Sequence, residues 1–126
     1  MSGARISTTE RGARGEARAA AYLQGQGWTV LARNFRTRRG EIDLVAQRGD
    51  ELAFVEVKSW RSIPREDLGR SIDSRKQARI ARAAQEFLAR RRDLAGAHVR
   101  FDVVFLGSGE DGLVHIPEAF GGEGID

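Results

Sequence analysis

Two acidic residues and a nearby lysine form the pattern in this sequence with the clearest chemical meaning. Asp43 lies in the segment 40–44 (Gly-Glu-Ile-Asp-Leu), and Glu56 and Lys58 lie in the segment 54–58 (Phe-Val-Glu-Val-Lys). Lys58 is one of only two lysines among twenty-one basic residues, and all the others are arginine. Lysine is a compact point charge whose pKa burial can shift, whereas arginine is a permanently charged, rigid fork. A lysine at this position therefore indicates chemistry rather than charge alone.

A predicted β-hairpin would bring these residues together. Segments 44–47 and 52–57 are rich in strand-forming residues, and the Gly49-Asp50 pair between them is typical of a type II′ turn. With that pair as the loop, opposed positions sum to 99, so Asp43 faces Glu56 and Glu41 faces Lys58. Because side chains alternate between the faces of a strand, these four would share one face. The other face would be uniformly apolar and would consist of Ile42, Leu44, Ala46, Ala53, Val55 and Val57.

The opposed carboxylates predict a metal site. Cross-strand partners lie about 5 Å apart at Cβ, and like charges there destabilise a hairpin unless a cation neutralises them. Mg²⁺, or Mn²⁺ in its place, takes oxygen ligands, polarises phosphoryl oxygens and lowers the pKa of a bound water. Lys58 would either hold that attacking water or offset charge developing on the phosphate. The sequence therefore predicts a metal-dependent phosphodiesterase. The alternative is a solvated polar face on which Lys58 pairs with Glu41 or Glu56, but the apolar neighbours favour a buried strand, where unpaired charges are costly.

The composition is that of one small domain. The chain has 126 residues and no cysteine, which excludes disulfides and thiolate chemistry. It contains neither an apolar run of about 18 residues nor the apolar core of a signal peptide, so we expect a cytoplasmic protein without membrane contact. His98 and His115 lie on separate predicted elements, which argues against a zinc site.

Basic residues are concentrated on both sides of the predicted hairpin. The net charge is +3, and no lysine or arginine follows Phe101. Four arginines near the hairpin in sequence are expected to contact the phosphate backbone of a nucleic acid, namely Arg36, Arg38, Arg39 and Arg61. The alternative is that the arginines reflect a GC-rich genome and solubility, and charge alone does not decide between the two.

The hydrophobic pattern predicts a helix, three strands, a second helix and two more strands (α-β-β-β-α-β-β). The first helix begins at Thr8 or Thr9, ends near residues 25–27 and runs through Ala13, Ala17, Ala20, Ala21 and Leu23. A strand from Trp28 to Ala32 leads into the hairpin, and a loop from Ser59 to about Arg70 follows it. The second helix, from about Ile72 to Arg92, has an apolar face of Ile80, Ala83, Ala84, Phe87 and Leu88. Strands at 99–106 and 113–116 complete the pattern.

Three further side chains are assigned to the interior rather than to a site. Trp28 and Phe35 are interpreted as core residues rather than base-stacking groups. Asp102, between Phe101 and Val103, is interpreted as the internal partner of an arginine such as Arg33 or Arg100.

Six segments together resemble the YraN-like family of uncharacterised bacterial proteins (uncharacterised protein family 0102), in order from about Gly12 to Phe120. They are Gly12-x-x-Gly15-Glu16, Arg33-Asn34-Phe35-Arg36, 40–44, 54–58, Lys76-Gln77 and 100–104. That family is similar to nucleases of the PD-(D/E)xK restriction-endonuclease-like fold, particularly archaeal Holliday-junction resolvases. The resemblance implies a single α/β domain (core about 9–120, with flexible ends) built on a mixed five-stranded sheet flanked by helices.

The resemblance also implies roles for particular residues. Asp43, Glu56 and Lys58 would form the catalytic core, Glu16 would be an additional acidic residue near the metal, and Lys76 and Gln77 would approach the site or the phosphate backbone. The expected substrate is DNA, at branched or recombination intermediates, with RNA left open. A homodimer is among the expected assemblies. A second hypothesis is a nucleic-acid- or partner-binding module that keeps the fold without catalysis. The usual Thr-Arg after Lys58 is replaced by Ser59-Trp60, which affects substrate contacts more than metal chemistry.

Overall fold

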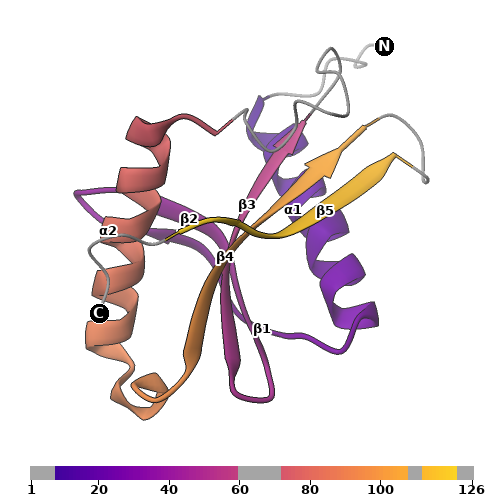
Figure 1. Cartoon of the computed structure of the whole chain (residues 1–126). Coiled ribbons are helices and arrows are strands. Elements are labelled where there is room, and N and C mark those ends of the chain that lie inside the picture. The colour runs from indigo at the N-terminus through magenta and orange to yellow at the C-terminus, as the bar shows by residue number, and fades with distance from the viewer. Residues whose placement is uncertain (1–7, 60–71, 108–111, 122–126) are drawn as a thin grey trace, which may run out of the picture.

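A mixed five-stranded sheet with one helix on each face forms the fold (Figure 1). The computed structural model describes residues 8–59, 72–107 and 112–121. The elements are α1 (Thr8–Gly25), β1 (Thr29–Arg36), β2 (Glu41–Arg48), β3 (Glu51–Ser59), α2 (Ser74–Arg90), the short 3₁₀ helix η2 (Arg92–Leu94), β4 (His98–Leu106) and β5 (Leu113–Phe120). The predicted α/β fold and its order of elements are confirmed.

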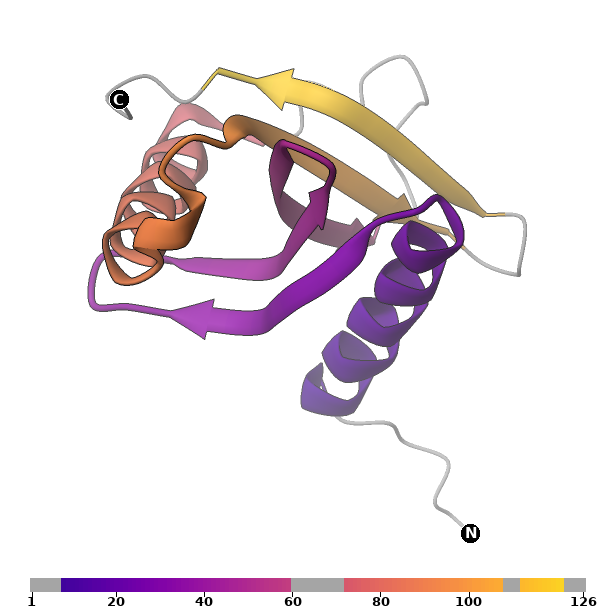
Figure 2. The same cartoon turned by 90° about the horizontal axis from the view of Figure 1, so that it is seen from below.

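The strands lie in the sheet in the order in which they occur in the sequence. Neighbouring strands are antiparallel except β3 and β4, which are parallel. A parallel pair needs a long crossover connection, and α2 lies in that crossover. Figure 2 shows the resulting strongly twisted sheet, with α1 and α2 on opposite sides of it. The carboxyl end of β3 and the start of α2 are thereby brought to the same end of the molecule.

The predicted hairpin register is confirmed over its central part. Arg48 pairs with Glu51, and the ladder continues to Leu44 and Val55. The φ angle of Gly49 is 61°, while that of Asp50 is not positive, as a type II′ turn requires. The ladder ends at Leu44, however, although β2 stays paired with β1 as far as Glu41. The predicted backbone pairings of Asp43 with Glu56 and of Glu41 with Lys58 were therefore wrong.

The predicted apolar face is confirmed for Leu44, Ala46, Ala53 and Val55, which pack together against α1. The opposite face is apolar as well, because it places Val45, Leu52 and Phe54 in the core beneath α2. Ile42 belongs to this second cluster as well, so the alternation of faces changes between Ile42 and Val45. The neighbouring strand is distorted at the same level, because Asn34 has a φ of 51°.

Helix α1 has the predicted bounds. Ala19, Ala20 and Leu23 are buried, whereas Ala17 and Ala21 are exposed. Alanines occur on several sides of this helix and therefore give a weak periodic signal.

Helix α2 buries the face that its periodicity predicted. Ile80, Ala83, Ala84 and Phe87 are buried and Leu88 is partly buried. The helix begins at Ser74 rather than at Ile72, because the Asp73 side chain accepts a hydrogen bond of 2.8 Å from the N–H of Lys76 and caps it. Asp73 thus fixes where Lys76 lies.

The outer strands are longer than predicted. β1 continues to Arg36, and β5 continues through Pro117 to Phe120. Proline is tolerated there because β5 is an edge strand. Trp28 is buried as predicted, and Phe35 packs edge-on against Phe87. In the described ranges, no helix combines the length and apolar character needed to span a membrane.

Candidate functional site

Asp43 lies where β2 and β3 separate. Its Oδ2 atom accepts a hydrogen bond of 2.8 Å from the main-chain N–H of Val57. The carboxylate thereby satisfies an N–H that has no partner on β2, because the ladder ends at Leu44. Asn34 lies opposite Asp43 on β1, between two regular pairs, in the left-handed conformation that asparagine tolerates better than most residues.

Glu56 is the most constrained acid of the site. Its side chain is only 7% exposed, and Lys76 Nζ lies 2.9 Å from Oε2. Burial, the charge of Asp43 and a hydrogen bond shared with the Asp43 carboxyl group raise the pKa of Glu56 to about 7, although the Lys76 ammonium acts in the opposite direction. Ionisation of Glu56 is therefore disfavoured in these surroundings despite the Lys76 ammonium group.

Glu16 brings a third carboxylate into the same electrostatic environment from α1. Burial and the charge of Asp43 raise its pKa, against a hydrogen bond donated by Asn34 and the charges of Arg36 and Arg33. The Asn34 side chain was not assigned a role from sequence. Two signals were available. Asn34 lies in one of the six segments that resemble the YraN-like family, and asparagine tolerates a positive φ.

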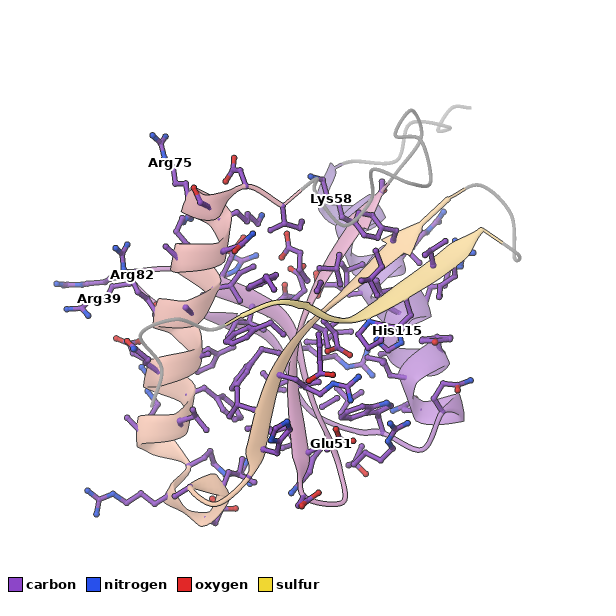
Figure 3. All side chains as sticks on the ribbon, in the orientation of Figure 1. Arg39, Glu51, Lys58, Arg75, Arg82 and His115 are labelled. Atoms are coloured by element: carbon purple, nitrogen blue, oxygen red, sulfur yellow. The ribbon has the colours of Figure 1, made fainter. Side chains whose placement is uncertain are left out.

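A cavity of about 300 Å³ adjoins Glu56 at the carboxyl end of β3. Its lining includes Glu56, Lys58 and Lys76, together with the helix cap Asp73. Figure 3 shows Lys58 at this end of β3. Two ammonium groups, which can bind a phosphate, and a nearly buried carboxylate, which can bind a cation, thus line one space. Asp43 is not part of the lining, but its carboxyl group contacts Glu56, which is.

Other residues expected at the site lie elsewhere. Gln77 donates from Nε2 to the main-chain oxygen of Ile72 (2.9 Å) and lines a different hollow, of about 350 Å³. Arg36 is exposed and lies 3.6 Å from the carboxylate of Glu41, although its charge also acts on Glu16 of the site. Arg38 and Arg39 are exposed in the turn between β1 and β2. Arg61 lies outside the described residues.

A second polar cluster surrounds Asp102, whose side chain is fully buried. Arg100 donates to both of its carboxylate oxygens (3.0 Å each), and the main-chain N–H of Glu118 donates to Oδ1 (3.1 Å). The predicted structural role with Arg100 is confirmed. Burial opposes ionisation of Asp102, but hydrogen bonds from His115 and Arg100 outweigh it and lower the pKa.

His115 belongs to this cluster and was missed by the sequence reasoning. Its Nε2 atom lies 2.7 Å from Oδ2 of Asp102, and its Nδ1 atom lies 3.0 Å from the hydroxyl of Tyr22. In the neutral ring Nε2 donates to the carboxylate and Nδ1 accepts from the hydroxyl. One indication of this contact was available in the sequence: a buried Asp102 needs several hydrogen-bond donors, so a donor besides the predicted arginine was to be expected. The cluster fastens α1 and β5 to β4.

The acids of the candidate site fit a metal held by a pair of carboxylates rather than by a larger cage. Within the described part of the chain, no three His, Cys, Asp or Glu side chains are gathered closely enough to hold a metal ion. Mg²⁺ usually retains several waters and takes one or two carboxylates from the protein. The hard oxygen donors of Asp43 and Glu56 match that requirement.

Comparisons with known proteins agree with the resemblance found in the sequence. The family model described as "Uncharacterised protein family UPF0102" matches residues 15–106. A UPF0102 protein of Rhodopseudomonas palustris is 43% identical over 117 residues, which cover 93% of this chain and 88% of that protein. A UPF0102 protein of Treponema pallidum is 42% identical (86% of this chain, 90% of that protein), and one of Halorhodospira halophila is 50% identical (75% of each). The chain therefore belongs to the uncharacterised protein family UPF0102.

Proposed function

We propose that the protein is a nuclease that hydrolyses phosphodiester bonds in DNA with Mg²⁺ or Mn²⁺ bound by Asp43 and Glu56. The observation that supports this most strongly is the contact between two carboxyl groups, one of them nearly buried, with the pKa of Glu56 raised to about 7. A like-charged pair in such surroundings destabilises the fold, and destabilising polar groups retained in a protein are typically functional. When bound, the ion would polarise the phosphoryl group and lower the pKa of a water molecule.

The residues of the chain have separate roles in this proposal. The N–H of Val57 fixes the orientation of the Asp43 side chain, so its carboxylate is preorganised to bind the ion. Lys58 and Lys76 line the cavity and would bind the non-bridging oxygens of a phosphate, where negative charge increases in the transition state. Glu16 adds negative charge beside Asp43 and strengthens the attraction for a cation. Branched DNA is the substrate class that the resemblance to junction resolvases suggests.

One observation favours the second hypothesis, a catalytically silent nucleic-acid-binding module. The ion pair between Lys76 and Glu56 (2.9 Å) already gives the carboxylate an internal cation. Removal of Lys76 distinguishes the two hypotheses. In a metal site Lys76→Gln leaves Mn²⁺ binding intact or strengthens it, whereas in a silent protein no variant binds the ion.

The proposal is tested by incubating the purified protein with labelled four-way-junction, duplex and single-stranded DNA and with duplex RNA. Each substrate is tested with Mg²⁺, with Mn²⁺ and with EDTA, and products are resolved on denaturing gels. We expect metal-dependent cleavage that Asp43→Asn, Glu56→Gln and Lys58→Met each reduce by about 100-fold or more. Asp50→Asn is the matched control, because Asp50 is exposed in the hairpin turn at the other end of β3.

Two results would count against the proposal. Cleavage that survives both Asp43→Asn and Glu56→Gln would assign the activity to another site or to a contaminant. Nucleic-acid binding without cleavage in either metal, combined with no heat of Mn²⁺ binding in calorimetry, would support the silent module instead.

A further inference from the structure

Five exposed arginines form a group that we call the basic patch. Arg38 and Arg39 lie in the turn between β1 and β2, and Arg75, Arg79 and Arg82 lie on α2. Figure 3 shows Arg39, Arg75 and Arg82 projecting outward from the α2 side of the molecule. The three α2 members were not among the residues expected to bind nucleic acid.

The turn is held firmly against α2. A Cβ atom at Gly40 would collide with the main-chain carbonyl of Arg79, so the two backbones are in direct contact. Within the turn, Thr37 Oγ1 accepts hydrogen bonds from the N–H groups of Arg39 (3.0 Å) and Gly40 (3.1 Å). The side chains of Arg38 and Arg39 are therefore carried on a rigid support beside the middle of α2.

The α2 members share one side of the helix. Arg75, Arg79 and Arg82 follow the i, i+4, i+7 spacing of a single helical face and span about 10 Å along the axis. The buried residues Ile80 and Ala84 lie on a different side. The next position of the same face is Glu86, which pairs with Arg90 at 3.8 Å, so the unbroken positive charge ends there.

The five arginines of the patch differ from several other arginines of the described residues in having no acidic partner. Among the described residues, no carboxylate lies within 4 Å of any of its five guanidinium groups, whereas Arg36, Arg48, Arg90, Arg91 and Arg100 each have one. Like charges gathered without counterions repel one another, and a polyanion would relieve that repulsion.

We infer that the basic patch binds the phosphate backbone of double-helical nucleic acid, an inference that rests on the proposed function and names the substrate class. Guanidinium forks bind phosphate oxygens in pairs, and a rigid array suits a duplex, whose phosphates have fixed spacing. Single strands are usually bound by stacking on exposed aromatic rings, and the patch consists of arginine alone. Arg75 directly precedes Lys76, which lines the cavity. A nucleic acid whose phosphate backbone is bound by the patch would therefore extend to the candidate site.

The test measures binding in EDTA, where no metal-dependent cleavage occurs. Fluorescence anisotropy compares a 20-base-pair duplex with a single strand of the same sequence at several salt concentrations. The double variant Arg79→Gln/Arg82→Gln removes two charges from the patch, and Arg38→Gln/Arg39→Gln removes two from the turn. Arg14→Gln/Arg92→Gln removes two exposed arginines from elsewhere as the matched control. Thermal melting verifies that each variant is folded.

For each patch variant we expect about ten-fold weaker duplex binding at low salt, and a slope of log affinity against log salt shallower by about 2, since each phosphate contact contributes about 0.9. The control should change the affinity less than two-fold. Equal losses in patch and control variants, or losses as large for the single strand as for the duplex, would overturn the inference. A wild-type protein that binds neither nucleic acid would instead overturn the proposed function, so the two failures are distinguishable.

Discussion

The carboxylate of Asp43 accepts a hydrogen bond of 2.8 Å from the main-chain N–H of Val57, the residue between Glu56 and Lys58. The first acid of the candidate site is therefore fastened to the backbone that carries the other two side chains. This contact exists because β2 and β3 separate after the pair Leu44 and Val55. The backbone thus contributes to the relative positions of the three side chains, together with the contact between the Asp43 and Glu56 carboxyl groups.

Asp43→Asn and Asp43→Ala should have different effects on stability. Asparagine keeps an oxygen that accepts from Val57 N–H, so we expect a melting temperature within a few degrees of wild type and a large loss of Mn²⁺ binding. Alanine leaves the N–H without a partner and should lower the free energy of unfolding by about 1–3 kcal/mol. Urea unfolding in EDTA measures both effects. Equal stability of the two variants would show that the hydrogen bond contributes nothing.

Glu56→Gln should stabilise the protein at pH 8 in EDTA. Because the pKa of Glu56 is raised to about 7, its ionised form is unfavourable in the folded state at that pH despite Lys76. An amide removes the repulsion from Asp43, and we expect the free energy of unfolding to rise by about 1–2 kcal/mol. The matched substitution Glu86→Gln, on the outer side of α2, should change stability by less than about 0.5 kcal/mol. A Glu56→Gln variant less stable than wild type would contradict the view that this pair is strained.

The Asp102 cluster should make stability depend on pH in the acid range. The pKa of Asp102 is lowered in the folded state, so its contribution is fully present above the ordinary aspartate value of about 4. That contribution is lost as the pH falls through the lower, folded value. Asp102→Asn should lower the free energy of unfolding at pH 7 by about 3 kcal/mol, because Arg100 and His115 lose a buried anion. Urea titrations from pH 7 to pH 3 should show this difference shrinking below pH 4; a constant difference would contradict the assignment.

Gly40→Ala should destabilise the protein and weaken duplex binding together. The added methyl group meets the carbonyl of Arg79, so the turn must move away from α2. We expect a loss of about 1–3 kcal/mol in the free energy of unfolding, the range for overpacked sites. Gly96→Ala is the matched control, since a Cβ there has no neighbour within 4 Å. Thermal melting and anisotropy in EDTA test the two parts; a Gly40→Ala variant as stable as the Gly96→Ala control would show that the contact is loose.

The sequence predicted those parts of the structure that depend on local patterns. Gly49 and Asp50 specified the turn and the register up to Leu44, and the periodicity of α2 specified its buried face. Alternation could not predict the change of face between Ile42 and Val45, because it arises where the strands separate.

Contacts between residues far apart in the sequence could be predicted only in part. Arg100 could be paired with Asp102 because both lie on one face of the same strand, two residues apart. Tyr22 and His115 could not be placed there, since the sequence does not specify how α1 and β5 approach β4. Lys76 was linked to the site through resemblance alone, because the crossover between β3 and α2 allows many helix positions. The predicted metal, substrate and catalytic roles stay predictions.

The contact between Tyr22 and His115 joins residues 93 positions apart. Forming it closes the larger part of the chain into a loop, which is entropically costly until other contacts have shortened the separation. The hairpin of β2 and β3, with its two-residue turn, carries no such cost. Asp102 therefore gains its full set of donors only near the end of folding, and destabilising this cluster should mainly accelerate unfolding while leaving the refolding rate nearly unchanged.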